Sequence, residues 1–219
     1  MVVEGLFFCI FAHQNVEAYK LQSSAEQIIL GIDPGTQILG YSLLEVKDGK
    51  ARTMVMDVLY LKKIPDFNLR IRRIFDSTVR IIDTFHPDHL AVEAPFFGKN
   101  VQSMLKLGRA QGVAIAAAMS RDLSYSEYEP AEVKRMVTGN GAASKEQVAT
   151  MLRALLDFPD EPRYFDATDA LAVAYTCFAK RNGAMASIQQ LESKSTSKRK
   201  KPSRKAWAEY VSQNPESVN

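Results

Sequence analysis

The sequence is poor in cysteine and histidine. Its only two cysteines, Cys9 and Cys177, cannot make a disulfide framework, which fits a reducing cytoplasm and excludes a small disulfide-stapled secreted protein. The three histidines, His13, His86 and His89, have no zinc-like spacing with either cysteine. The sequence therefore predicts a cytoplasmic protein without a structural zinc site.

The chain also lacks a long apolar run. No stretch approaches the roughly 20 apolar residues that a membrane-spanning helix needs, so we expect no membrane association. Residues 5–12 are apolar, but no Lys or Arg precedes them and no clear small-residue cleavage site follows, which argues against a secretory signal. We expect residues 1–27 to be an N-terminal extension outside the folded core.

The net charge of +3 is not a property of the whole chain. Residues 192–219 contain 7 of the 28 Lys and Arg and 3 of the 25 Asp and Glu, which leaves residues 1–191 with a net charge of −1. The main body therefore does not attract nucleic acid by its overall charge, and such attraction must come from local patches or from the tail. Residues 182–219 are predicted to be a basic, disordered tail, and residues 28–181 to be one folded domain.

The order of elements within this domain indicates the fold class. Three strands are expected at residues 28–32, 39–46 and 51–61, and Asp48-Gly49 favours a tight hairpin between the last two. The rest alternates, with helices at 69–85, 99–119, 131–137, 144–156 and 166–180 and strands at 88–93 and 123–128. The prediction is an α/β protein with a five-stranded mixed sheet, three strands antiparallel and the others parallel, and helices on both faces. That is the ribonuclease H-like architecture.

Four carboxylates occupy the ends of these elements. Asp33 follows the first strand, Glu93 ends the strand at 88–93, and Asp166 and Asp169 lie three apart at the start of the last helix, on one face of it. If the two strands are neighbours and the helix packs across their ends, all four carboxylates converge.

Each carboxylate has an ordinary explanation by itself. Asp33 precedes Pro-Gly in a turn, Glu93 could be a solvated strand end, and Asp166 could cap the helix while Asp169 favours its dipole. All lie within apolar sequence, however, and half-buried carboxylates that gather in this way repel one another and need a cation. Oxygen ligands without Cys or His select Mg²⁺ or Mn²⁺, and two such ions about 3.5–4 Å apart can activate water and stabilise the leaving oxygen of a phosphodiester.

Several segments resemble the crossover junction endodeoxyribonucleases of the RuvC family. The resemblance extends in order over residues 28–181. The matching segments are Ile32-Asp33-Pro34-Gly35-Thr36 with Gly40-Tyr41, Glu93-Ala94-Pro95-Phe96-Phe97-Gly98-Lys99-Asn100, Leu105-Lys106-Leu107-Gly108-Arg109-Ala110-Gln111-Gly112-Val113, Val133-Lys134, Gly139-Asn140-Gly141, Lys145-Glu146-Gln147-Val148 and Asp166-Ala167-Thr168-Asp169-Ala170-Leu171-Ala172.

The resemblance implies an activity, a metal and partners. It implies a homodimer that resolves Holliday junctions by paired, symmetric nicks, works beside a branch-migration helicase complex and forms its dimer through the helix at 99–119. The four carboxylates would then be the catalytic acids and the ligands of two Mg²⁺ ions per site, with Mn²⁺ as a substitute. The implied DNA-binding residues are Phe96, Lys99, Lys106, Lys134 and Lys145. A phenylalanine at the junction centre can stack on unpaired bases.

Two other functions remain open at this stage. Residues 31–36 could cradle a phosphate in an actin-like phosphotransferase, although the chain has no second repeat of this motif. The protein could instead bind branched DNA without cutting it, but four acids would then only weaken its contact with DNA.

Overall fold

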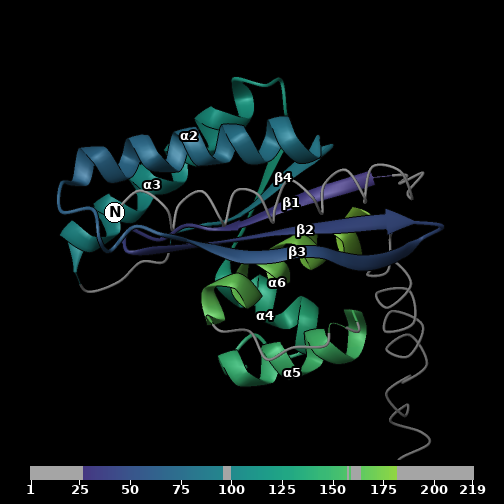
Figure 1. The fold of residues 1–219 in the computed structure, drawn as a ribbon. Coiled ribbons are helices and arrows are strands. Elements are labelled where there is room, and N and C mark those ends of the chain that lie inside the picture. The colour runs from purple at the N-terminus through teal and green to yellow at the C-terminus, as the bar shows by residue number, and fades with distance from the viewer. Residues whose placement is uncertain (1–26, 96–99, 157, 159–163, 182–219) are drawn as a thin grey trace, which may run out of the picture. The chain divides into compact units, whose positions relative to one another are not determined.

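One mixed sheet of five strands, in the order β3-β2-β1-β4-β5, forms the centre of the protein (Figure 1). The computed structural model describes residues 27–95, 100–156, 158 and 164–181. Strand β2 is antiparallel to both of its neighbours, β1 and β3, whereas β4 is parallel to β1 and β5 is parallel to β4. The strands are β1 (Gln27–Asp33), β2 (Ile38–Lys47), β3 (Lys50–Tyr60), β4 (His89–Glu93) and β5 (Tyr125–Tyr128). The predicted strand pairing is confirmed.

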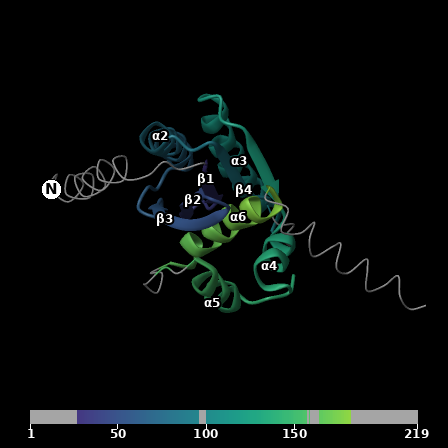
Figure 2. The same cartoon turned by 90° about the vertical axis from the view of Figure 1, so that its right-hand side faces the viewer.

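Helices cover both faces of this sheet, as the fold class predicted (Figures 1 and 2). On one face lie α2 (Phe67–Phe85) and α3 (Val101–Met119). On the other face α6 (Phe165–Arg181) crosses the strands, and α4 (Pro130–Thr138) and α5 (Lys145–Leu156) pack beside it. Among the described residues, no helix is both long enough and apolar enough to cross a bilayer.

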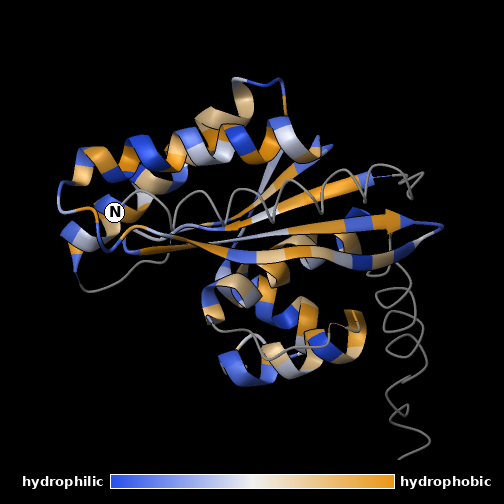
Figure 3. Cartoon of the chain, in the orientation of Figure 1, coloured by the Kyte–Doolittle hydropathy of each residue, from blue (hydrophilic) through white to orange (hydrophobic). Residues whose placement is uncertain are grey.

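The sheet divides the interior into two hydrophobic cores, and β1 contributes side chains to both. Successive side chains of a strand point to opposite faces, so Leu30 and Ile32 pack toward α2 and α3, whereas Ile29 packs toward α6. Because both faces are covered, a continuous apolar run suits this strand better than an alternating one. Figure 3 shows the contrast with α2, where apolar and polar residues alternate along a helix that is buried on one side only.

Local turn and cap residues set where the elements end. Asp48 and Gly49 both adopt the left-handed conformation, with φ of 51° and 72°, which the tight turn between β2 and β3 requires. Helix α3 begins at Val101 rather than at the expected residue 99, because the Asn100 side chain accepts a hydrogen bond from the Ser103 amide at 3.0 Å and caps the helix there.

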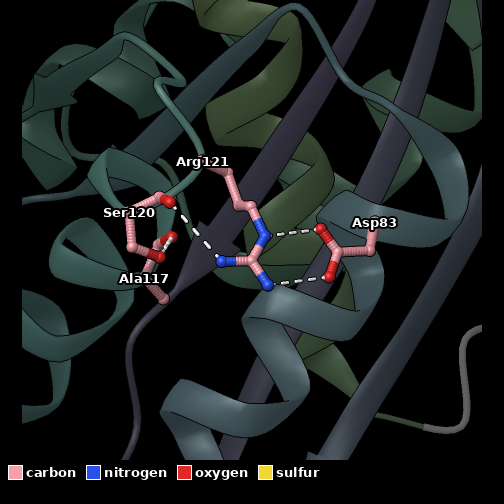
Figure 4. Close-up of polar contacts among 4 residues, drawn as sticks. All are labelled: Asp83, Ala117, Ser120 and Arg121. Carbon is pink, nitrogen blue, oxygen red and sulfur yellow. Dashed lines mark hydrogen bonds and ion pairs between the residues drawn. The ribbon is translucent and has the colours of Figure 1, made fainter.

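An ion pair joins the carboxyl ends of α2 and α3 (Figure 4). The guanidinium of Arg121, just beyond α3, donates from Nε and Nη2 to the two carboxylate oxygens of Asp83 in α2, at 2.7 and 3.0 Å. At the other end of these helices, Lys106 of α3 lies over the ring of Phe67 at the start of α2. The two helices therefore run parallel, with both amino ends at the same end of the sheet.

Candidate nuclease site

Two glycines let α6 lie directly on the sheet. A Cβ atom at Gly31 would come 2.2 Å from the carbonyl oxygen of Ala170, and one at Gly40 would come 1.8 Å from that of Asp166. Gly40 is also the β2 partner of Asp33 in β1. Close approach at these glycines therefore places the first turns of α6, with both of its aspartates, beside the end of β1.

Register places the other two carboxylates side by side. Strands β1 and β4 are parallel neighbours, and Ile32 pairs with Val92, so Asp33 and Glu93 are the next residues along each strand. Both are partly buried and line a pocket of about 680 Å³ at the carboxyl ends of these strands. Asp169 of α6 lines the same pocket.

Burial and mutual repulsion dominate the electrostatics of this pocket. Desolvation, followed by the interaction with Glu93, raises the pKa of Asp33 well above its usual range. Desolvation also raises the pKa of Glu93, although its hydrogen-bonding interaction with Asp33 opposes the shift. At least one proton or cation is thus favoured between these two groups.

Two lysines supply positive charge to the same pocket. Lys145, at the start of α5, donates from Nζ to the Oδ2 atom of Asp169. Desolvation lowers the pKa of Lys145, but the Asp169 hydrogen bond and the nearby carboxylates outweigh it and raise the pKa. Lys134 of α4 lines the pocket and lowers the pKa of Glu93 and Asp169 by its charge, although desolvation leaves both raised.

Asp166 lies beside the pocket rather than in its lining. It is partly buried in the first turn of α6, one residue after the helix begins, and therefore does not cap the helix. Its charge raises the pKa values of Lys145 and Asp169, so it belongs to the same electrostatic cluster. The fold thus brings three of the four predicted carboxylates to one pocket and places the fourth next to it.

The donor set suits a hard divalent cation by its chemistry. Of the residues that the structure describes, the ionisable ones in the lining are carboxylates and lysines, with no His or Cys, and oxygen donors of this kind favour Mg²⁺ or Mn²⁺. As the side chains lie, no three His, Cys, Asp or Glu groups of the described residues are placed to hold a metal ion. The Lys145 ammonium instead pairs with Asp169. The roles of the four carboxylates as ligands remain predictions.

The residues predicted to contact DNA are distributed over three places. Lys134 and Lys145 line the carboxylate pocket. Lys106 lines a second pocket between the amino ends of α2 and α3. Phe96 and Lys99 lie outside the described residues.

Three residues at this end of the sheet were missed by the sequence analysis. Glu129 lines the carboxylate pocket as a further acid, directly before the first residue of α4. Arg70 of α2 donates from Nη1 to the carbonyl of Thr36, in the turn after Asp33, at 3.0 Å. Neither has a distinctive sequence pattern, because an acid before proline and an arginine on a helix are ordinary surface residues.

Gln111 is the third missed residue, and its sequence context could have found it. It is a buried amide on a helix otherwise rich in Gly and Ala, and buried polar groups need partners. Its Nε2 atom donates to the carbonyl oxygen of Glu93 at 3.3 Å and to the Oε2 atom of Glu127 at 2.8 Å. Gln111 therefore holds the end of β4 from the face opposite the pocket.

Comparison with known proteins shows that the chain is similar to the members of one family. A sequence model described as crossover junction endodeoxyribonuclease RuvC matches residues 29–177. The chain is similar to the crossover junction endodeoxyribonuclease RuvC of Porphyromonas gingivalis, with 48% identity over 198 residues, which is 90% of this chain and 99% of that protein. Its counterpart from Bacteroides fragilis is 46% identical over 200 residues, again 90% and 99% of the two chains.

Solved structures show the same likeness. Thermus thermophilus RuvC in complex with a Holliday junction substrate has a TM-score of 0.66 and 34% identity, over 72% of this chain and 97% of that one. The yeast mitochondrial Holliday junction resolvase Ydc2 has a TM-score of 0.51 at 14% identity, over 75% of this chain and 82% of that one, and is therefore alike in fold alone.

Proposed function

Because the chain belongs to the crossover junction endodeoxyribonuclease RuvC family, we propose that it resolves four-way DNA junctions by paired, symmetric hydrolysis of phosphodiester bonds in recombination and repair. The observation that carries the proposal is the pocket at the ends of β1 and β4, where Asp33, Glu93 and Asp169 lie with Lys134 and Lys145. Opposite charges in one pocket suit a phosphodiester, whose own negative charge needs the lysines and whose hydrolysis needs the acids.

Nucleases of this family depend on divalent metal ions. We assign Asp33, Glu93, Asp166 and Asp169 as the catalytic acids that would hold two Mg²⁺ ions, with Mn²⁺ as a substitute. Such ions, when held by these carboxylates, would supply stabilisation of the charge on the phosphodiester oxygens and would lower the pKa of the attacking water. Support comes from the burial that raises the pKa of Asp33 beside Glu93, since a cation offsets the repulsion between two such carboxylates.

The two lysines bind and orient the substrate in this proposal. Lys145 holds its ammonium against Asp169, and Lys134 lies within electrostatic reach of Glu93 and Asp169. Both ammonium groups can donate to non-bridging oxygens of a phosphate that enters the pocket. The pocket volume of about 680 Å³ leaves room for a nucleotide backbone segment between them.

A homodimer explains how one site per chain can produce two nicks. Helix α3 exposes Val101, Leu105 and Met119 to 59, 56 and 60%, and no described atom outside the helix lies within 4 Å of a Cβ built at Gly108 or Gly112. An apolar helix face with small residues lets a second copy approach closely. Twofold symmetry then presents two identical pockets to the two symmetric strands of a junction.

Residues outside the carboxylate pocket and a further partner complete the proposed activity. We propose that Phe96 stacks on bases at the junction centre, that Lys99 and Lys106 contact the DNA backbone, and that the dimer works with a branch-migration helicase complex. The buried, free thiol of Cys177 is compatible with the reducing cytoplasm in which we place this activity.

Mapping nicks on synthetic DNA tests this function. The full chain is incubated with a four-way junction and with linear duplexes of the same arm sequences, with and without Mg²⁺. We expect nicks at symmetric positions in two strands of the junction, in Mg²⁺ only, with ends that a ligase reseals. Junction binding without cleavage in any divalent metal would favour the non-catalytic alternative, and tight ATP binding by calorimetry would favour the phosphotransferase.

A further inference from the structure

A second pocket, of about 340 Å³, opens between the amino ends of α2 and α3. Its charged lining residues are Arg70 and Lys106, and no Asp or Glu among the described residues lines it. Thr36 and Ser103 add hydroxyl groups, and Phe67 forms an apolar wall. A small pocket with two cations and two hydroxyls is suited to an anion with several oxygen acceptors.

The two cations at this pocket are not neutralised by described residues. Lys106 lies over the Phe67 ring, with Nζ 5.9 Å from the ring centroid, and makes no ion pair with any residue that the structure describes. Arg70 donates from Nε and Nη1 to the carbonyls of Ile64 and Thr36, at 2.6 and 3.0 Å. Carbonyl partners fix the guanidinium in place without cancelling its charge.

Helix geometry adds to the positive potential. Phe67 is the first residue of α2, and Ser103 is the third residue of α3. The first turns of both helices thus border the same pocket, and α3, which is capped by the neutral Asn100, presents the positive end of its dipole there, whereas the Asp66 carboxylate that caps α2 offsets the dipole of that helix. Together with the two cationic side chains, this favours one bound phosphate group.

This pocket adjoins the carboxylate site through one shared wall residue. Leu107 lines it and also lines a smaller hollow of about 120 Å³, whose other walls include Asp33, Glu93 and Pro95. Thr36 belongs to the turn that follows Asp33. A DNA strand with its scissile phosphate at the carboxylates would reach the second pocket by running over Leu107.

Resting on the proposed function, we propose that the Arg70–Lys106 pocket binds a backbone phosphate of the strand that is cut, at a fixed distance from the scissile bond. This contact positions the strand. It also stabilises the turn after Asp33, because the same guanidinium that faces the phosphate holds the Thr36 carbonyl. In this proposal Lys106 binds a phosphate outside the scissile bond, whereas Lys134 and Lys145 bind the scissile phosphate.

Variants that change charge without breaking the helix can test this pocket. Ser103→Glu places a carboxylate in the pocket lining, yet a Glu three residues after the Asn100 cap favours the start of a helix. Lys106→Gln removes one cation. The matched control is Asn68→Glu, an exposed first-turn position of α2 that does not line the pocket.

Binding to a labelled four-way junction is measured in EDTA over a range of salt concentrations. We expect Lys106→Gln to bind about tenfold more weakly, as for one lost charge-assisted hydrogen bond. We expect its plot of log affinity against log salt to be less steep by about 0.9, the value for one phosphate contact. Ser103→Glu should weaken binding at least as much with an unchanged or raised unfolding temperature, and Asn68→Glu should bind like the parent.

A scan with single methylphosphonates identifies the phosphate. The parent should lose affinity when one particular phosphate outside the scissile bond is made neutral, and Lys106→Gln should lose less at that position, because only Arg70 then remains to sense the phosphate charge. Parent-like junction affinity and salt slope in both Lys106→Gln and Ser103→Glu would overturn the proposal. A loss of affinity in these variants would also overturn it if no single methylphosphonate position weakened binding by the parent. Cleavage by the parent is scored separately, so failure of the pocket is distinguished from failure of the nuclease function.

Discussion

Gly40 of β2 lies directly against the backbone of Asp166 in α6, so closely that a Cβ atom at position 40 would come 1.8 Å from the Asp166 carbonyl oxygen. Gly40 is also paired with Asp33 across the β1–β2 ladder. The absence of a side chain at Gly40 thus sets how closely α6 packs on the sheet beside Asp33. The relative placement of the acids depends on backbone contact as well as on side-chain packing.

Replacing Gly40 with Ala should lift α6 from the sheet. We expect a loss of about 1–3 kcal/mol in unfolding free energy, typical of an overpacked core, because the added methyl meets backbone rather than a flexible side chain. Cleavage of a four-way junction should fall as well, since both α6 aspartates move. Denaturant unfolding and a cleavage time course check this, and parent values in both would show that the approach of α6 is not limiting.

Gln111→Leu should weaken both the fold and the nuclease. The change removes the donor that serves the Glu93 carbonyl and the Glu127 carboxylate, and a lost hydrogen bond of this kind costs about 1–2 kcal/mol. Because β4 ends at Glu93, its carboxylate should shift and the Mg²⁺ concentration for half-maximal cleavage should rise. A variant that loses stability but keeps its metal requirement would make Gln111 purely structural.

His89 should make stability depend on pH. Its ring nitrogens lie 2.7 and 2.9 Å from the hydroxyls of Ser124 and Ser126, and burial, followed by the charge of Arg181, lowers its pKa below the ordinary 6.5. The unfolded chain therefore binds a proton more readily, so the His89 contribution is present above pH 6.5 and is lost as pH falls through that value toward the lower folded pKa. His89→Gln should show a flatter decline in unfolding free energy between about pH 7.5 and about pH 5.5. An equally steep decline would assign the pH dependence to other groups.

Leu105→Glu should give a folded monomer. Leu105 is 56% exposed on α3, so a charge there has little effect within one chain but disrupts an apolar dimer surface. Light scattering should report half the parent mass, and paired nicking should decline to occasional single nicks. Leu105→Met, which keeps the surface apolar, should remain dimeric. A Leu105→Glu variant that stays dimeric would locate the interface elsewhere.

The sequence predicted those features that follow from local pattern and neighbouring strands. The apolar run before Asp33 indicated a strand buried on both faces, and the parallel pairing of β1 with β4 was enough to bring Asp33 beside Glu93. The family match confirms the predicted family and enzyme class, and the sheet confirms the predicted fold. The roles of individual carboxylates and lysines remain predictions.

Contacts between distant segments could not be predicted in the same way. Arg70 and Thr36 are separated by 34 positions, and their hydrogen bond depends on where α2 settles against the turn after β1. The ion pair between Lys145 and Asp169 likewise arises only when α5 packs beside α6. Such contacts depend on side-chain placement in three dimensions, which neither hydrophobic periodicity nor motif spacing determines.

The proposed role of Asp33 as a metal-holding acid of a junction nuclease can be isolated with the substitution Asp33→Asn. The substitution preserves the size of the side chain and removes its charge. Junction affinity in EDTA and cleavage rate in Mg²⁺ are measured on the same preparation. We expect Asp33→Asn to bind the junction nearly as tightly as the parent and to cleave it more than about a hundredfold more slowly, since even partners that only orient a metal ligand contribute about 10–100-fold. Cleavage by Asp33→Asn at the parent rate would contradict this role.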